Sequence, residues 1–197
     1  MKFLRDRLKS TLTIVCAVIP LLTAGSYSQE VEVPVSVQFP LLAKIMTFDR
    51  NLKSRVGTQI VFGIVYQSNY RTSLEIHDEF VKAMDESEIK DIAGSPLHHI
   101  SIDLSDEMDL SDALVQHPVD ILYVAPLRAY DLKTIMLIAR SKQIITMASA
   151  PADVESGLAI GISTRGEKPL IVVNLAEAKA EGADFSSSLL KLAKIIQ

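Results

Sequence analysis

The stretch TQIVFGIVY, residues 58–66, decides the fold of this chain. Its apolar side chains occupy odd and even positions alike: Ile60, Val61, Phe62, Ile64 and Val65. Successive side chains of a strand point to opposite faces, so both faces of this strand are apolar. Such a strand is typical of the centre of a parallel sheet that helices cover on both sides.

The segments on either side of this strand repeat at the helical period. Before it, apolar residues recur at Phe39, Leu41, Leu42, Ile45, Met46 and Phe48, and Pro40 fits the first turn of a helix. After it, one stripe carries Leu74, His77, Val81 and Met84. Thr72 and Glu75 have the spacing of a capping box, which predicts the start of the second helix.

The rest of the chain continues the alternation. Strands are expected over residues 98–104, 119–125 and 143–148, with helices over 109–117 and 128–141. Strands separated by helices form crossover connections and pair in parallel. After Gly157, strands over 158–163 and 170–174 are joined by a turn too short for a helix, which predicts an antiparallel hairpin. A helix over 175–180 and another from about Ser186 to Ile196 close the chain.

These patterns predict one α/β domain over residues 29–197. Its fold has three layers: a mostly parallel sheet, helices on both faces, and a C-terminal antiparallel hairpin.

The N-terminus has the build of a secretory signal peptide. Four basic residues within the first nine positions precede an apolar run over 12–23 and small residues up to Ser28. The run has 12 residues, whereas a membrane-spanning helix needs about 20. We expect residues 1–28 to be cleaved before Gln29, which makes the mature chain periplasmic and without a permanent membrane span. An uncleaved anchor stays the alternative.

Composition narrows the classes of function. The 197 residues include 20 Lys and Arg against 24 Asp and Glu. Removal of residues 1–28 takes away four positive charges and one negative, which leaves 16 against 23 and a formal net charge of −7. Such an acidic chain is poorly suited to nucleic acid. The only cysteine, Cys16, leaves with the leader, so the mature chain is expected to hold no disulfide.

No catalytic, cofactor or metal motif stands out. His98 and His99 are neighbours on a predicted strand, so their side chains would point to opposite faces and would not chelate one metal. The serines at 186–188 lack the surroundings of a nucleophile elbow and are better explained as helix caps. We predict that the chain is not an enzyme and needs neither cofactor nor metal.

One pattern favours a small ligand. In open parallel sheets, ligands bind in crevices at the carboxyl ends of the strands. Here those ends carry Ser68, Asn69, Arg128 and Ser149, and Arg128 can hold an anion. The alternative is that Ser68, Asn69 and Ser149 only cap or turn the chain while Arg128 is a surface side chain.

The last forty residues resemble the end of YfiR-like (YfiR/HmsC-like) periplasmic proteins. The similarity rests on Gly157-Leu158-Ala159-Ile160, Asn174-Leu175-Ala176, Ala178, Gly182, Ser187, Leu189-Leu190 and Leu192-Ala193. It extends more loosely over residues 39–148. Two features of well-known members are absent: the paired cysteines, and a Phe-x-x-Trp-Pro ending to the opening helix, where this chain has Met46-Thr47-Phe48-Asp49-Arg50.

The resemblance implies an exported, non-enzymatic repressor. Such a protein binds the periplasmic region of an inner-membrane diguanylate cyclase and so controls cyclic-di-GMP signalling and biofilm formation. The alternative is a periplasmic small-molecule-binding component for transport or sensing. The resemblance also implies a homodimer, for which Phe39, Leu42 and Met46 on the opening helix are candidate contacts, although packing inside one chain explains them equally well.

Overall fold

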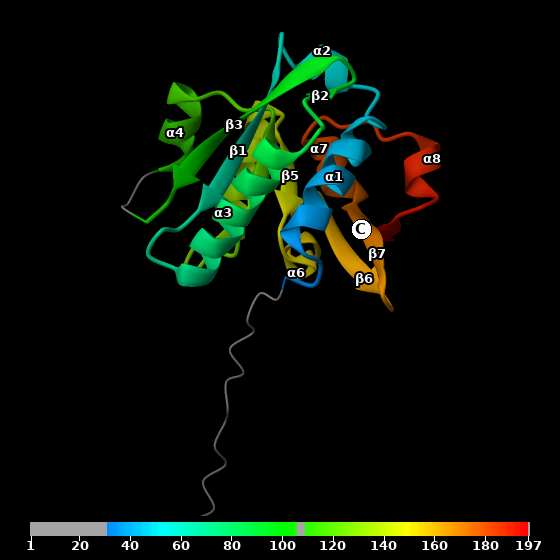
Figure 1. Cartoon of the computed structure of the whole chain (residues 1–197). Coiled ribbons are helices and arrows are strands. Elements are labelled where there is room, and N and C mark those ends of the chain that lie inside the picture. Colours follow the sequence, from blue (N-terminus) through cyan, green and yellow to red (C-terminus); the bar gives the residue numbers. More distant parts are fainter. Residues whose placement is uncertain (1–30, 106–108, 197) are drawn as a thin grey trace, which may run out of the picture.

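The computed structural model describes residues 31–105 and 109–196 (Figure 1). The predicted leader, with Cys16 and the cut after Ser28, lies outside these residues.

A mostly parallel sheet runs through the described part of the chain. Its order is β2-β3-β1-β4-β5-β6-β7-β8. The parallel core consists of β3 (Ser95–Asp103), β1 (Ile60–Tyr66), β4 (Ile121–Val124), β5 (Ile145–Ala148) and β6 (Ile160–Arg165). The hairpin partner β7 (Lys168–Asn174) is antiparallel to β6, and β8 (Lys194–Ile196) is parallel to β7. The short β2 (Asp91–Ile92) is antiparallel to β3.

Helices cover both faces of this sheet. The first face carries α1 (Val35–Met46), α2 (Leu52–Arg55), α3 (Arg71–Glu86), α7 (Leu175–Ala180) and α8 (Ser187–Leu190). The second carries α4 (Leu110–Gln116), α5 (Leu132–Lys142) and α6 (Pro151–Glu155). Each face of the sheet has its own hydrophobic core. Adjacent residues of β1 pack into different cores, Ile64 on the first face and Val65 on the second. The predicted three-layer α/β fold with its C-terminal hairpin is confirmed.

An aromatic cluster joins α1 and α3 to the sheet. The ring of Phe80 stacks on Tyr123 with centroids 3.6 Å apart and meets Phe39 edge-on at 5.7 Å. Phe62 lies 6.2 Å from Phe80 and 6.3 Å from Phe39. All four side chains are fully buried.

The opening helix packs inside the chain. Phe39, Leu42 and Met46, the candidate dimer contacts, are each 0% exposed. Intramolecular packing therefore accounts for them, and they offer no surface to a second copy. Pro40 is the sixth residue of α1 rather than part of its first turn, because the helix begins at Val35.

The C-terminal segment differs from its prediction. The helix expected from Ser186 ends at Leu190, and residues 194–196 form β8. Ile195 pairs with Val173, so this segment forms backbone hydrogen bonds with the edge of β7. Its β-branched residues favour a strand. The helical spacing of its apolar residues does not predict this pairing. Ser186 is the N-cap residue of α8, but its hydroxyl makes no capping hydrogen bond.

The start of α3 also differs. The capping box expected from Thr72 and Glu75 does not form, since Tyr70 is the N-cap residue and no side chain caps the helix. Glu75 instead accepts a hydrogen bond from Arg71 Nε at 2.7 Å.

Candidate functional site

The sheet has a topological switch point beside β1. The chain passes from β1 through α3 to β3 on one side, then returns through α4 to β4 on the other side. The loops that leave β1 and β4 diverge, because α3 and α5 cover opposite faces. Ligand crevices of open α/β sheets form at such a point, beyond the carboxyl ends of the strands.

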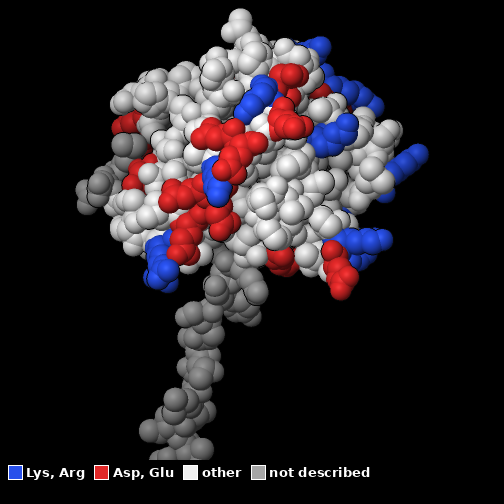
Figure 2. Space-filling view, in the orientation of Figure 1, with Lys and Arg blue, Asp and Glu red and all other residues white. Residues whose placement is uncertain are grey.

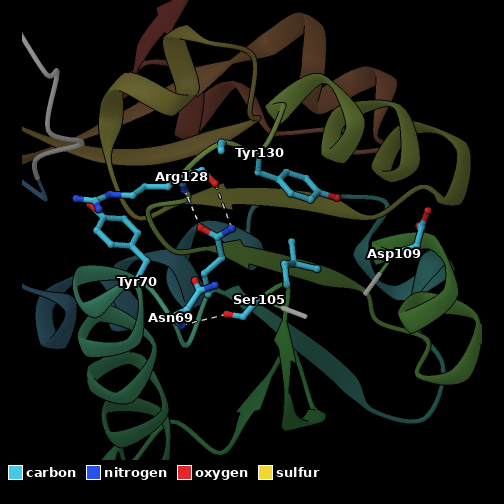
Figure 3. A pocket seen from close by; sticks show the side chains of 9 residues that line it. Asn69, Tyr70, Ser105, Asp109, Arg128 and Tyr130 are labelled. Carbon is cyan, nitrogen blue, oxygen red and sulfur yellow. Dashed lines mark hydrogen bonds between the residues drawn. The ribbon is translucent and has the colours of Figure 1, made fainter. Parts of the chain in front are cut away.

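A cavity of roughly 710 Å³ lies at this point. Figure 3 shows Arg128 and Tyr70 on one side of it, Asn69 and Ser105 below, and Tyr130 toward Asp109 on the other side. The lining residues come from the loop after β1, the residues that follow β3, the entrance to α4 and the loop after β4. The volume suits a small organic molecule.

Gln67 ties the two diverging loops together. Its Nε2 donates to the Arg128 carbonyl at 3.1 Å, and its Oε1 accepts from the Arg128 backbone N–H at 2.7 Å. The next residue, Ala129, has a φ of 51°, in the left-handed region. These contacts fix the backbone from which the Arg128 side chain extends.

The Arg128 guanidinium has no carboxylate partner among the described residues. Its Cζ lies 4.1 Å from the ring centroid of Tyr70. This cation–π contact orients the side chain but leaves its N–H donors open to solvent. A planar guanidinium held in this way can bind a carboxylate or phosphate with two hydrogen bonds.

Asp103 organises the opposite rim. Its Oδ1 accepts from the backbone N–H groups of Ser68 at 3.0 Å and Ser105 at 2.9 Å. Burial alone raises the pKa of Asp103, but the hydrogen bonds from Ser68 and Ser105 outweigh it and hold the pKa below its ordinary value. Ser105 Oγ in turn accepts from Asn69 N–H at 3.1 Å. The rim is therefore pre-formed around an ionised carboxylate.

Tyr130 supplies a neutral phenol to the cavity. Burial raises its pKa, and the charge of Asp109 raises it further. Asp109 caps α4 by accepting from Ser111 N–H at 2.6 Å, which confirms the expected helix start. The lining thus combines the Arg128 cation with hydroxyl and aromatic groups and, toward α4, the Asp109 carboxylate, so an anionic group would bind on the Arg128 side.

The four ligand-binding residues predicted from sequence have different positions. Asn69 and Arg128 line the cavity. Ser68 lies beside it, with its hydroxyl donating to Ser105 Oγ at 3.1 Å. Ser149 is buried elsewhere, and its carbonyl accepts from Gln38 Nε2 at 3.1 Å. Ser149 therefore contributes to the packing of α1, although it also follows a parallel strand.

Sequence reasoning missed Tyr70, Ser105 and Tyr130 as lining residues. Tyr70 and Tyr130 each lie within two residues of a predicted site residue. Their closeness to the strand ends is the sequence feature that could have identified them as lining residues. Nothing in the sequence indicated that Ser105 folds back over the loop after β1.

The outer face of α3 is acidic. Exposed carboxylates occupy Glu75, Asp78, Glu79, Asp85 and Glu86, and Figure 2 shows acidic side chains gathered over this part of the molecule. Such a face repels polyanions. Among residues 31–105 and 109–196, no cluster of metal-ligating side chains occurs and no helix is long and apolar enough to cross a membrane.

Solved structures with a similar fold come from bacterial proteins. One is the ABC domain in complex with L-Trp from Streptococcus pneumonia, at 17% identity and a TM-score of 0.55, covering 83% of this chain and 60% of that one. A ligand-free, open substrate-binding protein with adhesive properties from Clostridium difficile has 18% identity and a TM-score of 0.53, covering 75% and 57%. A conserved domain protein from Vibrio cholerae has 14% identity and a TM-score of 0.57, covering 83% and 60%.

This chain thus spans about 60% of the length of the solved proteins that it matches. At these identities the likeness shows the fold alone. No curated protein matches the sequence.

The family comparison is more specific. The sequence profile described as YfiR/HmsC-like matches residues 42–194, from the middle of α1 to the first residue of β8. The match includes strands β1 to β7 and the loops that line the cavity. The chain therefore belongs to the YfiR/HmsC-like family.

Proposed function

We propose that this chain is a periplasmic, non-enzymatic regulatory binding protein. Residues 1–28 act as a leader that is cleaved near Ser28, and residues 29–197 form the mature domain. That domain binds the periplasmic region of an inner-membrane signalling protein, a diguanylate cyclase, and keeps it inactive. It thereby lowers cyclic-di-GMP and restrains biofilm formation.

The observation that carries this proposal is the family match over residues 42–194. The fold supports a binding role, because loops at the switch point enclose a cavity of roughly 710 Å³.

Deletion of the gene should raise cellular cyclic-di-GMP several-fold, and the full chain should restore the original level. A chain that lacks residues 2–28 should fail to restore it, because the protein would stay on the wrong side of the inner membrane. The measurements are cyclic-di-GMP by mass spectrometry and capture of cross-linked partners from the cell envelope. Unchanged cyclic-di-GMP together with capture of no membrane signalling protein would refute the proposal.

A second function is supported by the cavity at the switch point. We propose that it binds a small anionic molecule, as a component for sensing or transport. The carrying observation is the Arg128 guanidinium, which lies over Tyr70 at the rim of a cavity of roughly 710 Å³. Among the solved structures of similar fold, one is in complex with L-Trp and one is named as a substrate-binding protein, so this fold is compatible with binding a small ligand.

The ligand proposal predicts a specific loss in Arg128→Ala. A ligand at 100 times its dissociation constant stabilises a protein by about 2.7 kcal/mol, which for a domain of this size raises Tm by roughly 5–10 °C. We expect one or more carboxylates or phosphates of a metabolite panel to give such a shift, and Arg128→Ala to abolish it. Lys133→Ala is the matched control, since Lys133 is exposed on α5 outside the cavity. Equal ligand-induced Tm shifts in Arg128→Ala and Lys133→Ala would show that Arg128 does not contribute to ligand binding.

A further inference from the structure

One edge of the sheet is open along most of β3. The short strand β2 pairs only with residues 95 and 96 of β3. One more backbone hydrogen bond, from Leu97 N–H to the Lys90 carbonyl at 2.9 Å, ends this cover. Beyond it, no strand within residues 31–105 and 109–196 lies outside β3 (Figure 1).

The backbone of β3 directs alternate residues away from the sheet. Leu104 N–H, directly after β3, donates inward to the Tyr66 carbonyl of β1 at 2.8 Å, whereas Leu97 N–H donates outward. Each residue of a strand directs its N–H and C=O to one side, and this side alternates along the strand. The outward backbone groups beyond Leu97 are those of residues 99, 101 and 103.

These outward groups have unmet hydrogen-bonding capacity. In the part of the chain that the structure describes, no group bonds the outward N–H and C=O groups of His99, Ser101 and Asp103. The side chains of these residues are already bonded within the chain, so the edge offers its backbone alone. An edge with free backbone donors and acceptors is a template for an extended segment of another protein.

On the first face of the sheet, α3 places two carboxylates beside this edge. Asp85 Oδ1 lies 3.1 Å from His99 Nε2. His77 bonds the Ser101 hydroxyl through one ring nitrogen at 2.6 Å and Asp78 through the other at 2.8 Å. The side chains of Asp85 and Asp78 are 63% and 66% exposed, so both carboxylates are open to a molecule that lies along β3.

The α3 side of the edge is negatively charged, and Figure 2 shows acidic side chains gathered over α3. Among the described residues, no Lys or Arg forms an ion pair with Asp78 or Asp85. The Lys and Arg of α3 pair with other carboxylates of that helix, and Lys90 Nζ binds the Asp85 carbonyl at 2.9 Å. Burial raises the pKa of Tyr66 at the end of β1, and the charges of Asp103 and Asp78 raise it further. A basic side chain at this edge is therefore attracted.

On the second face, the side chains beside the outward residues are apolar. Ile100 and Ile102 belong to the core of that face. Ile102 is buried and Ile100 is partly exposed, so an added strand can cover Ile100. Side chains of a strand alternate between the two faces. The segment that fits this edge therefore alternates between basic residues, which lie beside α3, and apolar residues, which lie beside Ile100.

We propose that an extended segment of the membrane signalling protein, with basic and apolar residues in alternation, adds to the sheet along β3. It exchanges backbone hydrogen bonds with residues 99, 101 and 103. Its basic side chains lie beside Asp78 and Asp85, and its apolar side chains cover Ile100. This assignment rests on the function proposed above, because it names the surface through which the chain holds its partner.

A defined peptide tests the edge without the partner. The probe is a short fluorescent peptide of alternating Lys and Val, and the control peptide has Glu in place of each Lys. Fluorescence anisotropy with the purified full chain should show binding of the Lys peptide and at least about tenfold weaker binding of the Glu peptide. The difference should shrink at high salt, because both carboxylates are exposed.

Variants of β3 test the backbone hydrogen bonds. Ser101→Pro removes the outward N–H, since the inward bonds of β3 belong to other residues, and proline is tolerated on edge strands. It should weaken binding of the Lys peptide about tenfold. Ser101→Ala is the matched control, because it also loses the hydroxyl but keeps the N–H, and it should bind like the wild type. Circular dichroism checks that both variants fold.

Variants of α3 test the charge and decide the outcome if Ser101→Pro unfolds. Asp78→Asn with Asp85→Asn keeps the shape of both side chains and should weaken binding of the Lys peptide about tenfold at low salt. Glu155→Gln with Glu167→Gln is the control, because it removes two exposed carboxylates from α6 and the β6–β7 turn, in the other half of the sheet. It should leave the affinity unchanged.

A measurement in cells tests whether the partner uses the same edge. In cells that lack the gene, the wild type and Ser101→Ala should restore cyclic-di-GMP to its original level, whereas Ser101→Pro at equal abundance should not. If the wild type itself has no effect on cyclic-di-GMP, the function proposed above is refuted, and the peptide titration still decides whether β3 accepts a basic strand.

The proposal is overturned if the wild type fails to bind the Lys peptide or binds both peptides equally. Full repression by a folded Ser101→Pro variant would also overturn it. So would a wild-type dimer that Ser101→Pro converts to a monomer, because a second copy would then occupy the edge.

Discussion

Replacing Phe80 with alanine is expected to lower the free energy of unfolding by about 3 to 5 kcal/mol. Phe80 is fully buried at the centre of the aromatic cluster, stacked on Tyr123 at 3.6 Å and edge-on to Phe39 at 5.7 Å. Alanine leaves a cavity between α3 and the sheet that these rings cannot fill by small shifts, because they are locked against one another. Thermal unfolding should show Tm lower by roughly 8–15 °C.

The control for Phe80→Ala is Val115→Ala. Val115 lies on α4 with 68% of its surface exposed, so its truncation should change the free energy of unfolding by less than about 0.5 kcal/mol. A loss below about 1 kcal/mol for Phe80→Ala would show that the cluster is not the main contact between α3 and the sheet.

Stability is expected to fall as pH rises from about 5 to 8, because of Glu181. This residue follows α7 and is fully buried. Its carboxylate accepts from Thr146 N–H and from the Thr146 hydroxyl, both at 2.7 Å. Burial raises the pKa of Glu181 from 4.5 to about 8, and the Thr146 hydrogen bonds only partly oppose this rise.

The sign follows from proton binding. Between the unfolded pKa of 4.5 and the folded pKa of about 8, the folded state holds a proton on Glu181 that the unfolded state releases. The free energy of unfolding therefore decreases through this range and levels off above it. The total change is about 5 kcal/mol, from a pKa difference of about 3.5 units at about 1.4 kcal/mol per unit.

Glu181→Gln should remove most of this decrease. The amide keeps an acceptor for Thr146 N–H and a donor for its hydroxyl, but it does not ionise. Urea unfolding at pH 5 and pH 8 should give a variant close to the wild type at pH 5 and clearly more stable at pH 8. Glu86→Gln is the control, because 71% of the Glu86 side chain is exposed. Parallel pH profiles for the wild type and Glu181→Gln would contradict the predicted coupling.

Some features of the candidate site follow from local sequence. Asn69 and Arg128 were found because polar residues directly follow two buried strands, and parallel strands bring their carboxyl ends to one edge. The same rule placed Ser149 there as well, yet Ser149 is buried against Gln38. The position of polar residues after buried strands therefore predicts which end of the sheet has the cavity. It does not predict which of the loops at that end line the cavity.

Other features depend on contacts between distant segments. Ser105 reaches Asn69 across 36 positions of the chain, and Gln67 bonds Arg128 across 61. Neither pairing leaves a periodic pattern in the sequence, because each is a single hydrogen bond between loops. The raised pKa of Glu181 also depends on distant segments, because the fold buries its carboxylate beside Thr146, which lies 35 positions away.

Local side-chain spacing is enough to predict the central strand, the alternation of helices and strands and the antiparallel hairpin, and local motifs are enough to indicate the family. Each depends on side chains close together in the chain, whose spacing encodes which face is buried. Tertiary structure alone decided that residues 194–196 pair as a strand, that the opening helix is buried rather than free, and that the cavity forms between loops after β1 and β4. These three features depend on which backbone edges and apolar faces come into contact in the folded chain. The spacing of residues along the sequence does not predict such long-range contacts.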